Sequence, residues 1–170
     1  MNSNKNIIFL GMMGSGKSSI GNLVSKKLNI PFFDIDNLIE EYIGMTISEI
    51  FLKKGEEYFR NLEEKITLKS LRNKKCVISL GGGGFINDKV RKNIISNHFS
   101  FWLDCDNSIL IRRIKNSKKR PLSFKLTDQE INAIIKKRIK IYSKAQFKIN
   151  CNKVTKAEIV KEIIRIYELN

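Results

Sequence analysis

Five short apolar runs recur along the chain, and the segments between them carry apolar residues at helical spacing. The runs are the predicted strands: Asn6–Leu10, Pro31–Asp34, Cys76–Leu80, Phe99–Leu103 and Phe147–Asn150. Alternating strands and helices are typical of a parallel sheet with right-handed crossovers and helices on both faces. The 170 residues contain neither an internal repeat nor a dividing linker, so we expect a single α/β domain over residues 1–170.

The starts of several helices are marked by capping residues. Three capping boxes, each a Thr followed three residues later by a Glu, precede periodic apolar residues. They are Thr46–Glu49, Thr127–Glu130 and Thr155–Glu158. Asp88 and Asp106 are predicted to cap two more helices. Gly55 is expected to end one helix and to separate it from the next, over residues 56–72.

Residues 11–18 read GMMGSGKS and follow directly on the first predicted strand. They match the phosphate-binding P-loop pattern G-x-x-x-x-G-K-[ST], and a helical pattern begins at their end. The glycines allow backbone N–H groups to point inward at an anion. Lys17 can then reach the β- and γ-phosphates, and the Ser18 hydroxyl can ligate Mg²⁺. We therefore predict a nucleoside triphosphate site.

Two carboxylates, Asp34 and Asp36, end the second predicted strand. Their spacing of two would place them on the same side of the strand, at the edge where open α/β sheets bind ligands. The third strand runs into glycines with no acid, so Asp34 is the candidate for positioning Mg²⁺. A structural role is the alternative, with Asp36 as the N-cap of the helical run 37–41 and Asp34 in a turn.

Two further patterns are less specific. The glycine run 81–84 could offer backbone N–H donors to a ligand or form a flexible turn, and we favour the ligand. Arg60 and Glu63 share a helical face, where Glu63 could orient the guanidinium, but a surface ion pair is the commoner arrangement. Composition alone assigns no role to Arg138, and Arg120 in the basic loop could fold over phosphates or simply be solvated.

The net charge of +15 fits either a nucleic-acid surface or solubilising residues combined with sites for anionic substrates. The basic residues are spread over most helices, which favours the second explanation, so we expect no nucleic-acid partner. The three isolated cysteines, Cys76, Cys105 and Cys151, indicate reduced thiols. A single histidine, His98, argues against Ser-His-Asp chemistry. We expect no signal peptide and no membrane segment, and a cytoplasmic location.

Taken in order, GMMGSGKS, FFDID, GEEYFRNLEE, SLGGG, KRPL and KRIKIY resemble the shikimate kinase family, from Ile7 to about Ser143. The resemblance implies a three-layer P-loop kinase fold of the nucleoside-monophosphate-kinase type with a five-stranded parallel sheet. It also implies transfer of the γ-phosphoryl of ATP to the 3-hydroxyl of shikimate, on the route to chorismate and the aromatic amino acids. One Mg²⁺ would accompany ATP, and we expect a monomer whose partners are ATP and shikimate.

The resemblance assigns roles by position. Catalysis would fall to Lys17, Asp36 and Arg120, with Asp36 as the proposed base and Arg120 in a mobile lid at about 115–125. Ser18 and Asp34 would hold the metal, and Asp34 would do so through water. The ATP-binding residues would be Gly14, Ser15, Gly16, Lys17, Ser18, Ser19, Arg113 and Arg120. The shikimate-binding residues would be Asp36, Phe51, Phe59, Arg60, Glu63, Gly81, Gly82, Gly83 and Arg138, with an acceptor-binding helical segment at about 36–63.

Two departures from the family pattern are present. Ser123 stands where the family usually has a second Leu in the lid, and residues 152–156 lack the proline that many members place against adenine. We therefore assign no adenine contact to residues 152–156. Two competing functions are another small kinase on the same fold and a catalytically silent or nucleic-acid-binding protein. The first would lose the set formed by Asp36, Arg60 and Arg138, and the second would not need a complete set of reactive residues.

Overall fold

The predicted strands form one parallel sheet in the computed structural model, which describes residues 4–116 and 126–170. The strands are β1 (Ile7–Leu10), β2 (Phe32–Asp34), β3 (Val77–Ser79), β4 (Phe99–Asp104) and β5 (Phe147–Asn150), in the order β2-β3-β1-β4-β5. The helices are α1 (Lys17–Leu28), α2 (Ile35–Ile43), α3 (Ile47–Ser70), the short η1 (Gly84–Ile86), α4 (Asp88–Asn97), α5 (Asn107–Lys115), α6 (Asp128–Tyr142) and α7 (Lys156–Leu169). This confirms the expected α/β class.

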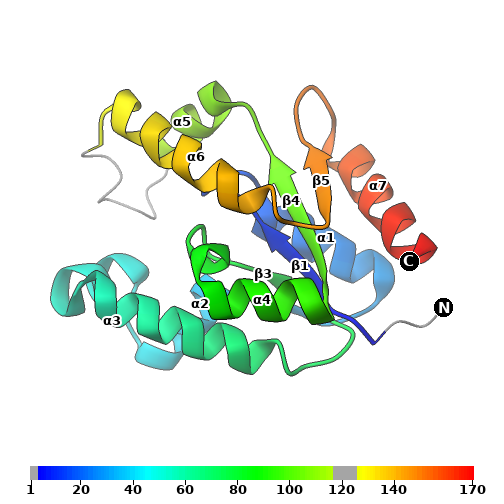
Figure 1. Cartoon of the computed structure of the whole chain (residues 1–170), viewed down its shortest axis with the longest axis horizontal. Coiled ribbons are helices and arrows are strands. Elements are labelled where there is room, and N and C mark those ends of the chain that lie inside the picture. The colour runs from blue at the N-terminus through cyan, green and yellow to red at the C-terminus, as the bar shows by residue number, and fades with distance from the viewer. Residues whose placement is uncertain (1–3, 117–125) are drawn as a thin grey trace.

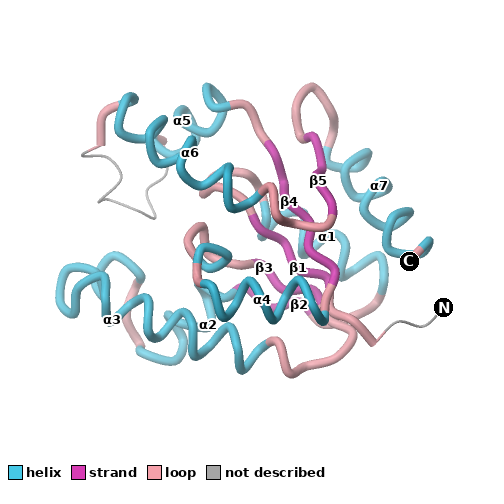
Figure 2. Tube along the Cα trace, in the orientation of Figure 1, coloured by secondary structure: helices cyan, strands magenta, loops and turns pink. Residues whose placement is uncertain are grey.

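Apolar residues on both faces of the sheet create three layers. Along β1, Ile7 and Phe9 pack on one face while Ile8 and Leu10 pack on the other, and all four are essentially buried. The first face is covered by α1 and α7, and the second by the helices from α2 to α6. The sheet runs between these helical layers (Figures 1 and 2). Burying such a side chain contributes about 1.5–3 kcal/mol.

The strand order fixes where a ligand can bind. From the central β1, the chain forms β2 and β3 on one side and then crosses to form β4 and β5 on the other. In open α/β sheets, ligands bind outside the carboxyl ends of the strands at such a switch point. The loops that follow β1, β2 and β3 meet at this edge, and each carries residues predicted to form the site.

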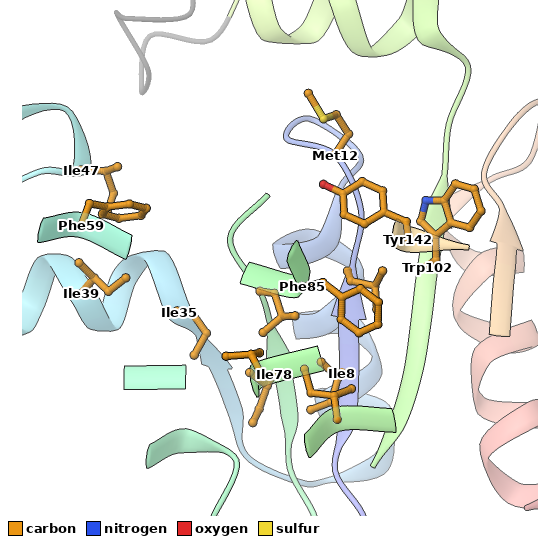
Figure 3. Packing of buried hydrophobic residues seen from close by; sticks show 14 of the residues in the cluster. Ile8, Met12, Ile35, Ile39, Ile47, Phe59, Ile78, Phe85, Trp102 and Tyr142 are labelled. Carbon is orange, nitrogen blue, oxygen red and sulfur yellow. The ribbon is translucent and has the colours of Figure 1, made fainter. Parts of the chain in front are cut away.

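The helices α2 and α3 form a separate wall beyond the sheet. The capping box at Thr46 and Glu49 is present, and Gly55 breaks the helical path of α3 with φ 84° and ψ 171°, as predicted. Ile39, Ile47 and Phe59 pack together at a distance from the sheet residues (Figure 3). This wall stands beside the carboxyl ends of the strands and can therefore close one side of a ligand site.

Several local predictions were wrong in detail. Asn87, not Asp88, is the N-cap of α4, because its Oδ1 accepts the N–H of Val90 at 3.1 Å. Asp106 is the N-cap of α5 but makes no side-chain capping bond. Asp34, not Asp36, caps α2. The strands also differ from their predicted bounds by one residue at some ends, as strand and helix ends commonly do between assignments.

Within residues 4–116 and 126–170, the structure has no helix that is both long and apolar enough to cross a membrane. The predicted lid at about 115–125 lies almost entirely outside the described residues, and so do Arg120 and Ser123.

Candidate active site

The P-loop joins β1 to α1 at the switch point of the sheet. Gly11 has φ 137°, and a Cβ there would lie 2.8 Å from the carbonyl oxygen of Leu103, so only glycine fits. Gly16 forms the N-cap of α1. The ammonium of Lys17 donates to the carbonyl oxygens of Gly11 and Met12, each at 3.0 Å. Lys17 is thus folded over the loop, beside the backbone N–H groups that can bind phosphate.

The predicted metal residues meet directly. The Ser18 hydroxyl donates to Oδ2 of Asp34 at 2.5 Å. The other oxygen, Oδ1, accepts the backbone N–H groups of Asp36 at 3.1 Å and Asn37 at 3.4 Å, which fixes the carboxylate at the start of α2. A hydroxyl and a carboxylate oxygen are ligands that Mg²⁺ accepts while it keeps several waters. The residues present therefore fit one Mg²⁺ ion.

The spacing of the two aspartates predicted that both belong to the second strand. The structure shows that they do not. β2 ends at Asp34, and Asp36 lies in the first turn of α2. Both still line the same cavity, because the helix begins at the edge of the sheet.

A cavity of about 330 Å³ lies over the P-loop. It brings together residues predicted for the nucleotide and the metal: Gly14, Gly16, Lys17, Ser18, Ser19, Asp34, Asp36 and Arg113. Arg113 reaches it from α5, and its Nη1 donates to the carbonyl oxygen of Gly14 at 2.9 Å. Ser15 is 4% exposed and is not among the residues that line the cavity.

A second cavity of about 260 Å³ lies between the glycine run and α3. Its lining includes most residues predicted for the acceptor: Asp36, Phe51, Phe59, Arg60, Glu63, Gly82, Gly83 and Arg138. Asp36 and Met13 line both cavities. The two cavities therefore adjoin at Asp36, where a nucleotide phosphate and an acceptor could meet.

Arg60 and Glu63 do not form an ordinary surface ion pair. Nη1 of Arg60 lies 2.6 Å from Oε2 of Glu63, and Glu63 is only 4% exposed. Burial raises the pKa of Glu63, while Arg60 opposes this effect. Burial tends to lower the pKa of Arg60, but Glu63 and Glu56 raise it overall. The guanidinium also lies 5.0 Å from the ring centroid of Phe59. Arg60 is thus held in place while part of it faces the cavity.

The glycine run passes closely between charged side chains. A Cβ on Gly81 would lie 2.5 Å from Oε1 of Glu63 and 2.6 Å from Oδ1 of Asp36. A Cβ on Gly83 would lie 2.8 Å from Cζ of Arg60. A side chain at either position would therefore displace the charged groups that line the site. The alternative of a merely flexible turn does not account for these contacts.

Arg138 reaches the acceptor cavity from α6. Its Nη1 lies 3.7 Å from Sδ of Met12 in the P-loop, and it would lie 3.3 Å from a Cβ on Gly82. Tyr142, one turn later, is 2% exposed and donates its hydroxyl to the carbonyl oxygen of Gly82 at 2.5 Å. In Figure 3 this hydroxyl points toward Met12. Tyr142 therefore ties α6 to the glycine run beside Arg138.

Some lining residues escaped prediction from the sequence. Met13 separates the two cavities, while Ile47, Ser48 and Ile134 line the acceptor cavity alone. Ile47 and Ile134 follow the apolar periodicity of their helices, which marks a buried face but does not distinguish a cavity wall from core.

Comparison with known proteins identifies the family. A family model described as shikimate kinase matches residues 13–168. The chain belongs to the shikimate kinase family. A shikimate kinase from Aquifex aeolicus is 42% identical over 165 residues, covering 96% of each chain. Another, from Thermodesulfovibrio yellowstonii, is 38% identical over 165 residues, covering 96% of this chain and 95% of the relative. The resemblance inferred from the sequence motifs is confirmed.

Solved structures agree with this assignment. A shikimate kinase from Acinetobacter baumannii in complex with shikimate superposes with a TM-score of 0.91 at 27% identity, covering 98% of this chain and 94% of that one. The Aquifex aeolicus shikimate kinase gives a TM-score of 0.85 at 38% identity, with 96% of each chain covered. A gluconokinase from Sinorhizobium meliloti, at 17% identity and a TM-score of 0.61, shares the fold. The P-loop kinase fold predicted for this shikimate kinase family member is therefore confirmed.

Proposed function

We propose that this shikimate kinase family member transfers the γ-phosphoryl group of ATP to the 3-hydroxyl of shikimate, as a step toward chorismate and the aromatic amino acids. The observation that carries the proposal is the junction of two cavities at Asp36. One cavity is built on a P-loop and the other ends in Arg60 and Arg138. Such an arrangement can align a triphosphate with a small acceptor that carries a carboxylate.

The protein's work on the nucleotide is positioning and charge stabilisation, because phosphoryl transfer needs little covalent help from side chains. The P-loop N–H groups and Lys17 bind the phosphate oxygens, and the start of α1 adds its positive dipole end. Ser18 and Asp34 would hold one Mg²⁺ ion, Asp34 through water. Bound there, such an ion would supply positive charge opposite the phosphate oxygens. Arg113 lines the same cavity, and in this proposal it stacks on adenine.

The acceptor is held at two ends. Arg60 and Arg138 bind its carboxylate, for which the planar guanidinium fork is well shaped. Asp36 contacts the reacting hydroxyl at the other end and receives its proton as the bond to phosphorus forms. Phe51 and Phe59 form the apolar wall against which the ring packs. Glu63 braces Arg60 and stays behind the glycine run.

The remaining assignments form part of the same proposal. The protein acts as a cytoplasmic monomer on ATP and shikimate, without nucleic-acid or membrane partners. Arg120 closes over the phosphates from the lid. The high positive charge then serves solubility and the binding of anionic substrates.

The test is ADP release from ATP with purified protein, measured with and without Mg²⁺ and across a panel of hydroxy acids and nucleotides. Shikimate should stimulate ADP formation only when Mg²⁺ is present, with a phosphorylated acceptor as the second product. Stimulation by a nucleotide instead of shikimate would indicate a different kinase. A rate that stays at the ATPase background with every acceptor would contradict the proposal, provided the protein is folded. Duplex DNA serves as the control for a nucleic-acid effect.

A further inference from the structure

Two of the three cysteines lie side by side at the ends of neighbouring strands. β4 and β5 pair in parallel with Asp104 opposite Asn150, so the next residues along, Cys105 and Cys151, come opposite each other. The ladder continues to this point, since the N–H of Cys151 donates to the carbonyl oxygen of Asp104 at 2.8 Å. Neighbouring strands lie about 4.8 Å apart, which falls within the range of Cα separations that a disulfide spans.

The two thiols interact and differ in character. Both are free, with Cys105 only 6% exposed and Cys151 partly exposed. The Sγ of Cys151 donates to the carbonyl oxygen of Ile149 at 3.5 Å. The neighbouring Cys151 lowers the pKa of Cys105, burial opposes this, and Arg113 and Lys17 lower it further. Cys105 and burial raise the pKa of Cys151. Cys105 is thus the sulfur that more readily becomes a thiolate, with a protonated partner beside it.

Cys105 also contacts the nucleotide loop. Its Sγ donates to the carbonyl oxygen of Ser15 in the P-loop at 3.6 Å. The same segment leads into α5, which carries Arg113 to the carbonyl oxygen of Gly14. A disulfide would remove the thiol hydrogen that Ser15 accepts and would turn the sulfur toward Cys151. The P-loop would then lose one of the contacts that support its backbone.

We propose that Cys105 and Cys151 form a peroxide-sensitive thiol pair whose oxidation to a disulfide weakens nucleotide binding. The Cys105 thiolate attacks one oxygen of hydrogen peroxide, forming a sulfenic acid and releasing hydroxide, which takes up the proton lost by the thiol. The Cys151 sulfur then attacks the sulfenic sulfur. The disulfide forms, and the sulfenic oxygen leaves as water with the Cys151 proton. Overall, two thiols and one peroxide give one disulfide and two waters.

The third cysteine provides a matched control. Cys76 is fully buried, donates its thiol to Oδ1 of Asn6 at 3.2 Å, and has its pKa raised to about 11 by burial. It lies beside β3, away from the pair. Cys76→Ala should therefore leave the oxidation of the pair intact, whereas Cys151→Ser should abolish it.

The experiment treats the full-length protein with hydrogen peroxide and measures intact mass, disulfide-linked peptides and ATP binding by titration. The wild type and Cys76→Ala should lose two hydrogens, yield a peptide linking residues 105 and 151, and bind ATP about three- to tenfold more weakly, the range for losing one hydrogen bond. Dithiothreitol should restore the affinity. Cys151→Ser should yield no linked peptide at peroxide doses that oxidise the wild type.

Absence of the linked peptide from the peroxide-treated wild type would overturn the proposal, whatever the variants show. An unchanged ATP affinity in a protein with the disulfide would overturn the link to the P-loop. The inference rests on the proposed function only through ATP binding. Since binding is titrated directly, absence of shikimate-dependent turnover would count against that function and not against the thiol pair.

Discussion

Adding one methyl group to the glycine run should greatly lower kcat while leaving ATP affinity unchanged. In Gly81→Ala the new Cβ would lie 2.5 Å from Oε1 of Glu63 and 2.6 Å from Oδ1 of Asp36, whereas ordinary contacts begin at 3.4 Å. The backbone of Gly81 has no left-handed φ, so the substitution acts through these contacts alone. Both contacts must lengthen by nearly 1 Å to restore normal packing, so the carboxylates of both residues are displaced.

The larger displacement should be that of Asp36. Glu63 is 4% exposed and its other oxygen is held 2.6 Å from Arg60, which resists its movement. Asp36 borders both open cavities and can turn into them. A displacement of about 1 Å at a reacting group costs about 100-fold in rate. We therefore expect kcat to fall about 100-fold with shikimate as acceptor.

The matched control is Gly84→Ala, three residues along the same run. Its Cβ would lie 3.5 Å or more from every neighbouring atom, at ordinary contact distance. That variant should stay within about twofold of the wild type, as expected for a change of less than about 0.5 kcal/mol. The assay measures kcat and KM for shikimate in both variants, together with ATP affinity and Tm. Equal losses in the two variants, or a Gly81→Ala enzyme as fast as the wild type, would refute the reasoning.

Three other results are expected. Asp36→Asn should retain ATP affinity but lose most of its turnover, and turnover within a few-fold of the wild type would remove Asp36 from the mechanism. Arg138→Lys keeps the charge but loses the guanidinium fork. Titration should therefore show that shikimate binds about 10- to 100-fold more weakly, while ATP affinity changes little. Equal effects on both ligands would contradict a carboxylate contact. Hydrogen bonds from the capping threonines lower the pKa of Glu49, Glu130 and Glu158 below the ordinary value of 4.5. The stability that these ionised carboxylates contribute is therefore present above pH 4.5 and is lost as the pH falls through the lowered pKa values. Tm should therefore fall less steeply with acid when all three are changed to Gln, and superimposable curves would contradict this.

The elements that follow from local sequence were predicted well. Each strand is a short apolar run, and the P-loop carries its own backbone requirements, so both are encoded within about ten residues. The N-cap of α4 shows the limit of this local information. Asn87 and Asp88 are both good capping residues, and only the hydrogen bond from Val90 shows that Asn87 takes the role.

The acceptor side of the site depends on contacts that local patterns do not encode. From spacing alone, Arg60 and Glu63 fitted a surface ion pair, but Glu63 is buried and the glycine run packs against it. Arg138 reaches Met12 although 126 residues separate them in the chain. The order of the family motifs along the chain predicted that these residues belong to one site. No single motif could do so, because the site is formed by the fold as a whole.

The order of charges through the site can also orient the acceptor. Lys17 lines the nucleotide cavity, Asp36 lines both cavities, and Arg60 and Arg138 line the acceptor cavity but not the nucleotide cavity. A molecule with a carboxylate and a hydroxyl is attracted by the arginines and presents its hydroxyl to Asp36. The reversed molecule would place its carboxylate against Asp36, and two unit charges about 4 Å apart repel by about 4 kcal/mol at an effective dielectric constant of about 20. The charges that bind the acceptor therefore also exclude the unproductive orientation, so binding and alignment for phosphoryl transfer have the same physical cause.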